Sequence, residues 1–570
     1  MKPSLRDFWL PEGAEQIAIS DSISSALRCV AEAETETLSR YLDSFDWALY
    51  QAGAALQEET VGERRELVWL DLNKRGAIVA RQPLEDTPGF IDAMPLGPVR
   101  DLLEPLLGIR RLLPMASVSV RARTLRVLNE DDKTVARIRI EENWLIADGA
   151  RPGLALRGRL RLSPVRGYAR ELDDAAQRLE RALNLTPADE PVFSAAVAAA
   201  GLTPGAYSTS LSYRLDPRQR ADAAAKEILQ DLLDTLEANV DGTRRNLDSE
   251  FLHDLRVATR RTRSALSQIK GVFPEPIVDD FKARFAWLQQ VTGPMRDLDV
   301  YLLDYPGLRD SLPRAMRDDL EPLRDWLGSH YAEEQSRLVE ALDSPQFENL
   351  MREWRAFLQA PVPVTSTPGD PENAGRSIKT VADRRIRSMF KRLLREGRAI
   401  TDASPAEELH ELRKTCKKLR YLMEFFQSLY PPADIRRLIK QSKVLLDNLG
   451  GFQDLEVQAL HLAETAKRMH ADGSGGAGTL LSMGVLINTL IDSQHRARAD
   501  FAQTFAGFDT DANRTAFEAL FGARKDAPRE GDPPVAPPVE AGADPAADVE
   551  PDASAARGRP SAETGTGVRA

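Results

Sequence analysis

Cysteine and long apolar runs are both scarce in this chain. Cys29 and Cys416 are its only cysteines, which excludes a disulfide framework and a cysteine-rich zinc site. No apolar run reaches the length of a membrane-spanning helix, and the opening MKPSLRDFWLPEG lacks the apolar core of a signal peptide. We therefore expect a cytoplasmic protein without a membrane partner.

The charge is uneven along the 570 residues, although the formal net charge is -11. The stretch 525–570 is rich in Pro, Ala, Gly and acidic residues and has almost no large apolar side chain. Such a composition cannot bury enough surface to offset chain entropy. It predicts a disordered acidic tail.

Before this tail, the hydrophobic pattern of the sequence differs between an N-terminal and a C-terminal region. Residues 1–200 contain alternating runs such as ELVWLDL, ASVSVRART, TVARIRIEE and LRGRLRL, which predict β-strands. A linker is expected over 201–220, around GLTPGAYSTSLSYRLDP. Residues 221–520 repeat apolar side chains every three or four positions, which predicts helices throughout.

The helical region contains an internal repeat. HDLRVATRRTRSAL from His253 matches HELRKTCKKLRYLM from His410, 157 residues later. The same offset places Phe273-Pro274 on Tyr430-Pro431 and the RDLDV of 296–300 on the QDLEV of 453–457. This indicates a tandem duplication, with repeats at about 221–305 and 377–462 and a helical insert or linker at 306–376.

One stripe of each repeated helix is apolar and is predicted to be buried. It comprises Leu252, Leu255, Thr259, Thr262, Leu266 and Ile269 in the first copy, and Leu409, Leu412, Cys416, Leu419, Met423 and Phe426 in the second. Cys416 is therefore interpreted as a core residue with no redox role.

A basic stripe lies one position further round each helix. It comprises His253, Arg256, Arg260 and Arg263 in the first copy, and His410, Arg413, Lys417 and Arg420 in the second. A solvated face is the alternative interpretation, but such a face normally mixes charges of both signs. Because both copies keep the same spacing with few acids, the pattern favours an anion-binding groove.

Further basic residues increase the positive charge around the repeated helix of the second copy. Arg384, Arg387 and Lys391 precede its repeated helix, and Arg436, Arg437 and Lys440 follow it. Charge of one sign at this density predicts a polyanionic ligand. Tyr421, Phe425 and Phe426 fall on or near the core stripe, where they cannot stack on bases. The pattern favours an unadorned phosphate chain, while an RNA-binding or scaffolding role stays open.

The repeated motifs resemble the CHAD (conserved histidine α-helical) domain over about 221–520. The resemblance implies two helical bundles and a basic groove that binds inorganic polyphosphate and directs the protein to polyphosphate granules. It carries the family's basic positions onto the two basic stripes and Arg296. Gln453 stands where the second RDLDV-type element would have Arg. No cofactor and no specific nucleic acid are expected, and no protein partner is predicted.

Residues 1–200 are similar to a CYTH domain, the triphosphate tunnel fold, through RYLDSFDWALYQAGAAL and through Arg121, Arg123 and Arg126. The resemblance implies an antiparallel β-barrel-like domain, so the expected fold class is α+β. Its metal-binding pattern looks eroded: the expected opening strand reads EGAEQIAIS, Gln57 and Glu58 stand for a basic pair, and Arg157, Arg159 and Arg161 stand where carboxylates would hold Mg²⁺ or Mn²⁺. We expect a non-enzymatic domain without a metal. A divergent triphosphatase is the alternative.

Overall fold

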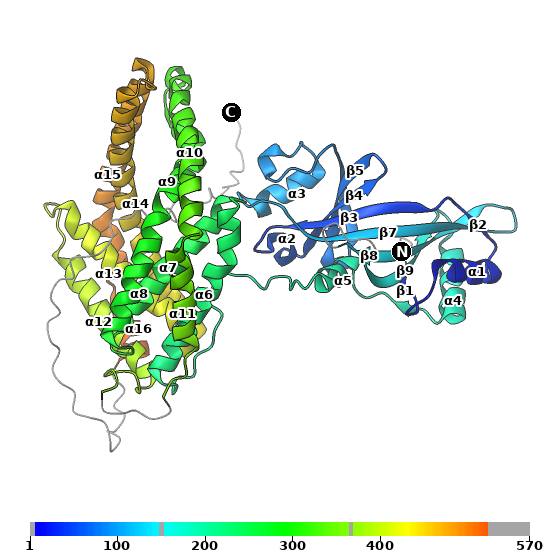
Figure 1. Ribbon diagram of the computed structural model, residues 1–570, viewed down its shortest axis with the longest axis horizontal. Coiled ribbons are helices and arrows are strands. Elements are labelled where there is room, and N and C mark those ends of the chain that lie inside the picture. The colour runs from blue at the N-terminus through cyan, green and yellow to red at the C-terminus, as the bar shows by residue number, and fades with distance from the viewer. Residues whose placement is uncertain (1–5, 147–152, 364–368, 523–570) are drawn as a thin grey trace, which may run out of the picture. The chain divides into compact units, whose positions relative to one another are not determined.

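The chain divides into two compact units, Met1–Thr209 and Ser210–Ala570. The computed structural model describes residues 6–146, 153–363 and 369–522, so the tail predicted at 525–570 lies outside the described residues. The first unit is an antiparallel sheet with flanking helices, and the second is helical (Figure 1). This confirms the α+β fold class.

The sheet unit has ten strands in the order β10-β1-β9-β8-β7-β3-β4-β5-β6, with β2 paired to β7. The hydrogen-bonded path ends at β10 and β6, so the barrel-like domain is an open sheet. The four alternating runs lie in β5, β7, β8 and β9, which confirms them as strands. The strands are β1 (Arg6–Trp9), β2 (Cys29–Ala31), β3 (Thr35–Asp43), β4 (Ala54–Val61), β5 (Arg64–Asp71), β6 (Ala77–Leu84), β7 (Leu113–Leu128), β8 (Thr134–Leu145), β9 (Leu154–Pro164) and β10 (Thr186–Pro187).

The two faces of the sheet differ in polarity along β8. Ile138 and Ile140 enter an apolar cluster with side chains of α1 and α4. Side chains alternate across a strand, so Arg139 and Glu141 point to the opposite face, where they line a pocket. The helices of this unit are α1 (Gln16–Ala26), α2 (Ala48–Gln51), α3 (Pro98–Leu107), α4 (Ala169–Leu183) and α5 (Val192–Ala199).

The helices of the second unit follow the sequence repeat. Those of the first copy are α6 (Ala221–Arg244), α7 (Ser249–Gln268), α8 (Glu275–Val291) and α9 (Gly293–Ser311), and the insert adds α10 (Glu321–Leu342) and α11 (Pro345–Gln359). Those that follow are α12 (Ile378–Ala399), α13 (Ala406–Phe425), α14 (Pro432–Ala471), α15 (Ala477–Phe508) and α16 (Asp511–Phe521). α12, α13 and α14 begin at the residues that the offset of 157 predicts from α6, α7 and α8.

One apolar core joins both copies and contains side chains of α6, α7 and α8 together with side chains of α12, α13 and α14. Every residue of the two predicted apolar stripes is buried, which confirms them. The thiol of Cys416 is fully buried and donates to the carbonyl of Ser442, and burial raises its pKa to about 12. It is a core residue, as the spacing predicts.

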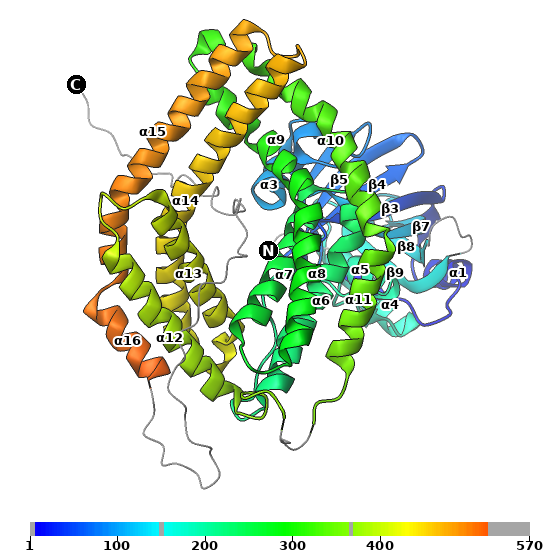
Figure 2. The same ribbon diagram turned by 60° about the vertical axis from the view of Figure 1, so that its left-hand side comes forward.

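The two copies differ where α8 ends. Pro294 has no N–H to continue α8, so the first copy turns at Thr292 and starts α9. Gly450 and Gly451 stand at the positions equivalent to Gly293 and Pro294, and α14 continues through them without a break. Beyond the shared apolar core, the α9–α10 and α14–α15 pairs separate, and they meet again at their far ends (Figure 2). A second apolar cluster at these ends includes Trp326. The described helices all fall short of the combination of length and apolar character that a membrane span requires.

Candidate functional site

The two copies of the basic helix, α7 and α13, contact one another. Nε of Arg260 donates to the hydroxyl of Tyr421 at 3.1 Å, and Nη2 of Arg261 lies 3.6 Å from a carboxylate oxygen of Glu424. Arg420 also donates to Glu424, at 2.8 Å. Cations of both copies therefore meet where the two helices cross.

Both helices carry long basic stretches without an acid. Between Asp254 and the end of α7 there are four arginines and no acid. Between Glu411 and Glu424, α13 has Arg413, Lys414, Lys417, Lys418 and Arg420. Lys414 and Lys417 share with Tyr421 the face of α13 that leads into the crossing, because they precede it by seven and four residues.

Arg256 and Arg413, the central arginines of the predicted groove, are buried within their own copies. Arg256 is 7% exposed and donates from Nη1 to the carbonyl of Gln289 and the hydroxyl of Thr292, at 2.7 and 2.8 Å. It thereby binds the end of α8. Arg413 is 3% exposed and pairs through Nη2 with Asp454 at 3.1 Å. Both side chains hold helices together.

His410 is positioned by the residue that departs from the family pattern. Its Nδ1 lies 2.6 Å from Oε1 of Gln453. Burial lowers its pKa, helped by Lys414 and Arg413 and opposed by the Gln453 hydrogen bond. The equivalents in the first copy are His253, half-buried on α7, and Arg296, whose Nη1 donates to the carbonyl of Ser249 at 3.3 Å.

The outer basic residues lie on α12 and α14. Arg384 pairs with Glu372 at 3.6 Å, and Nε of Arg436 donates to the carbonyl of Pro432 at 2.9 Å. The others have no hydrogen bond or ion pair with any described residue: Arg387, Lys391, Arg437 and Lys440. Lys391, Arg437 and Lys440 are exposed. α13 contacts both α12 and α14, so these cations lie on helices that flank the basic helix.

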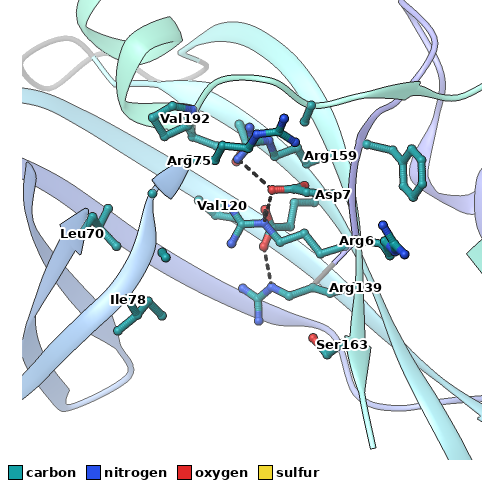
Figure 3. Close-up of a pocket in the computed structure, with 18 of the residues that line it drawn as sticks. Arg6, Asp7, Leu70, Arg75, Ile78, Val120, Arg139, Arg159, Ser163 and Val192 are labelled. Atoms are coloured by element: carbon teal, nitrogen blue, oxygen red, sulfur yellow. Dashed lines mark hydrogen bonds and ion pairs between the residues drawn. The ribbon is translucent and has the colours of Figure 1, made fainter. Parts of the chain in front are cut away.

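A second charged site lies in the sheet unit. It is a pocket of about 1140 Å³ with cations and carboxylates on its walls (Figure 3). β1 and the strands from β3 to β9 contribute side chains, and α4 adds Asp173 and Glu180. A Cβ on Gly76, just before β6, would lie 3.1 Å from Cβ of Pro191, so the segment that precedes β6 contacts the segment between β10 and α5 at the pocket.

Asp7, Glu141 and Glu59 on the pocket wall are each paired with guanidinium groups. Oδ2 of Asp7 lies 3.3 Å from Nη1 of Arg159 and 3.6 Å from Nε of Arg161. Glu141 accepts from Nε of Arg139 at 2.7 Å, and its other oxygen lies 3.5 Å from Nε of Arg161. Glu59 pairs with Arg81 at 2.8 Å.

Several expectations about this unit need correction. The proposed opening strand, EGAEQIAIS, contains a turn and the start of α1, and the opening strand is β1 instead. Arg157 does not line the pocket with Arg159 and Arg161, because the β8–β9 register shifts beside it. Arg121 and Arg126 lie on β7 but pair with Glu142 and Glu32 away from the pocket.

Sequence reasoning missed the carboxylates of the pocket. Asp7 lies on β1, outside the segment EGAEQIAIS that is expected to form the opening strand. Arg139 and Glu141 lie two residues apart in TVARIRIEE, and this alternation was the signal that could have found them. Gln57 does line the pocket, whereas Glu58 is buried behind β4 against Arg40 and Arg65.

Comparison with known proteins bears on the helical unit. Residues 227–463 match the family model of the CHAD domain. This match falls within the helical unit and extends from α6 into α14. Two uncharacterized proteins of Mycobacterium tuberculosis strains are 29% identical to the chain over 223 residues, which is 38% of this chain. The chain spans 40% of the length of these curated relatives.

Solved structures are similar to each part of the chain. A CHAD domain from the plant Ricinus communis is 24% identical, with a TM-score of 0.42, and covers 55% of this chain and 96% of that one. A Hippeastrum protein with a dominant triphosphatase activity is 10% identical, with a TM-score of 0.25, and covers 36% of this chain and 99% of that one.

Proposed function

We propose that the CHAD domain binds inorganic polyphosphate and that the chain is a polyphosphate-binding protein of cytoplasmic granules, without enzymatic activity. The observation that carries this proposal is the acid-free basic stretch on each of the two helices that cross, α7 and α13. Part of this charge is paired within the unit, as Arg261 and Arg420 are with Glu424, and a bound polyanion offsets the positive charge that remains.

The ligand is long because the cations extend beyond the crossing. Lys391 on α12 and Lys440 on α14 are exposed and have no ion pair among the described residues. Both helices contact α13. A linear polyanion that starts at the crossing can therefore reach further cations on the flanking helices, which a single phosphate group cannot.

The buried aromatic residues favour a bare phosphate chain over RNA. Tyr421, Phe425 and Phe426 are at most 4% exposed. Single-stranded nucleic acids are held by cations together with exposed aromatic rings that stack on bases. The aromatic residues next to this basic surface are used in the core, so the surface offers contacts to phosphate only.

A titration of the full chain with inorganic polyphosphate tests the proposal. Lys440→Glu places an acid among the proposed contacts, and Lys467→Glu makes the same charge change elsewhere on α14, at a side chain that is 75% exposed. We expect Lys440→Glu to weaken binding by roughly threefold or more and Lys467→Glu to have a smaller effect. Equal losses would mean attraction by total charge alone.

Two further experiments distinguish polyphosphate binding from an RNA-binding role and from a triphosphatase activity. Unlabelled RNA at equal phosphate concentration should displace polyphosphate poorly, and efficient displacement would favour an RNA-binding role. The full chain should release no phosphate from triphosphate with Mg²⁺ or Mn²⁺. Metal-dependent turnover that persists through purification would assign a triphosphatase activity to the sheet unit.

A further inference from the structure

The pocket of the sheet unit does not fit the divalent metal that the CYTH resemblance implies. A metal of this kind needs several oxygen ligands whose charge it can satisfy. Here Asp7, Glu59 and Glu141 each lie against at least one guanidinium group. Among the described residues, no group of three or more His, Cys, Asp or Glu side chains could hold a metal ion.

We propose that this pocket binds a compact, multiply charged oxyanion without a metal ion. Arg159 and Arg161 receive the anion, and Asp7 and Glu141 are internal counterions that the anion displaces from them. The carboxylates therefore oppose ligand binding, whereas the carboxylates of a metal site would promote it.

Buried guanidinium nitrogens that lack a hydrogen bond within the described chain mark the ligand position. Arg159 is 1% exposed, yet its Nε has no hydrogen-bond partner within the described chain, and the same holds for Nε of Arg161. The ion pairs of Arg161 are 3.5 and 3.6 Å long, beyond hydrogen-bond distance. Buried donors of this kind are costly unless something accepts from them. Both belong to side chains on the pocket wall.

The overall charge of the pocket matches an anion. Its walls carry seven cationic side chains and five acidic ones. The cations are Arg6, Lys74, Arg75, Arg81, Arg139, Arg159 and Arg161, and the acids are Asp7, Glu59, Glu141, Asp173 and Glu180. Several cations from different strands surround one space, so an anion with several charges satisfies more of them than a monovalent one does.

Asp7 is a weak counterion for its two arginines. Burial raises the pKa of its carboxyl, and Glu141 raises that pKa further, while Arg161 and Arg159 oppose the shift. An anion that engages Arg159 and Arg161 removes the groups that keep Asp7 ionised. Binding is therefore coupled to protonation of Asp7.

The test uses the full chain, inorganic tripolyphosphate as the probe and EDTA to remove metals. Hydrogen exchange read by peptide should show protection of β1 and β9 in EDTA. At pH 7, Asp7→Asn should tighten binding by roughly threefold or more, because it removes an opposing charge and keeps the shape. Arg161→Gln should weaken binding by roughly tenfold.

A matched control lies on the same strand. Arg157 donates to the carbonyl of Leu10 and to Thr186 outside the pocket, so Arg157→Gln should leave binding unchanged. If Asp7→Asn fails to fold by circular dichroism, Glu141→Gln makes the same comparison. The proposal is overturned if protection of β1 and β9 requires Mg²⁺ or Mn²⁺, if the neutralised carboxylate weakens binding, or if protection is confined to α7 and α13. Because the readout is resolved by segment, it stands apart from polyphosphate binding by the helical unit.

Discussion

Arg260 of α7 donates a hydrogen bond to the hydroxyl of Tyr421 on α13, so the two copies of one repeat are joined by side chains that are not equivalent. Lys417 stands at the position equivalent to Arg260, and Ser264 at the position equivalent to Tyr421. The bulk of Tyr421 fills one side of the crossing only. The duplicated helices are therefore related in sequence but fixed against each other by an asymmetric contact.

Removing this hydroxyl should loosen the contact between the copies. Tyr421→Phe keeps the buried ring and deletes the acceptor of a charged donor, which costs about 1–3 kcal/mol in the free energy of unfolding of the helical unit. Urea unfolding followed by helix content measures it. Tyr50→Phe in the sheet unit is the control, and it should not shift the urea midpoint of the helical unit. An unchanged midpoint for Tyr421→Phe would show that the bond adds no stability.

Arg413 should matter for stability before it matters for binding. It is buried against Asp454, and breaking such a pair costs about 3 kcal/mol because the carboxylate that remains is only 17% exposed. Arg413→Ala should lower the thermal midpoint of the helical unit by several degrees or more, whereas Arg436→Ala, at an exposed side chain on α14, should leave it nearly constant. A variant as stable as the parent would contradict the structural role of Arg413.

The protonation of His410 should respond to the ligand. Its pKa is lowered by burial and by Lys414 and Arg413. A bound polyanion favours the imidazolium form and raises that pKa, so protons are taken up on binding. Affinity should then rise as the pH falls from about 7 towards 5, an interval that includes the reference histidine pKa of about 6.5.

Calorimetry in buffers of different ionisation enthalpy counts these protons. His410→Gln should flatten the pH dependence and leave most of the affinity, which comes from Arg and Lys. The competing interpretation is that His253 and His410 only hydrogen-bond within their own repeats. Zero proton uptake across the whole interval would decide for that interpretation.

Asp299 should make the helical unit less stable at alkaline pH. Burial raises its pKa to about 7, opposed by Arg296 and by the hydrogen bond from Tyr331. The unfolded carboxyl has a pKa near 3.9, so between about pH 4 and 7 the folded state binds more protons. Stability therefore falls as the pH rises through this interval.

Asp299→Asn removes this penalty. The variant should be more stable than the parent at pH 8, by at most about 4 kcal/mol for a shift of this size, and the gain should shrink at pH 5. Thermal melts at the two pH values make the comparison. A gain that is equal at both values would show that Asp299 does not titrate between them.

Local periodicity was enough to predict that the second unit is helical and which stripes of the two repeated helices are buried. The stripes through Leu255 and Cys416 are buried as their spacing requires, because a helix repeats every 3.6 residues whatever packs on it. The same reasoning could not separate the basic residues. Arg413 and Lys417 share a stripe, yet Arg413 turns to Asp454 on α14, a partner that only the tertiary packing supplies.

The sheet unit was harder to predict for a physical reason. Strand alternation locates a strand but not its neighbours, and the partners of Arg161 come from β1 and β8, far apart in sequence. A single register shift between β8 and β9 separates Arg157 from Arg159 and Arg161. The short β1 has no periodicity of its own, so Asp7 could not be recognised before the strands were paired.

The most direct test of polyphosphate binding is its salt dependence, measured with the full chain. Neutralising phosphates releases condensed counterions, and about six contacts on a single-stranded polyanion give a slope of roughly -4 when the logarithm of the binding constant is plotted against the logarithm of the salt concentration. Lys440→Glu should make the slope shallower by about 1, and Lys467→Glu should leave it unchanged. A slope near zero, or no saturable binding at low salt, would contradict the account.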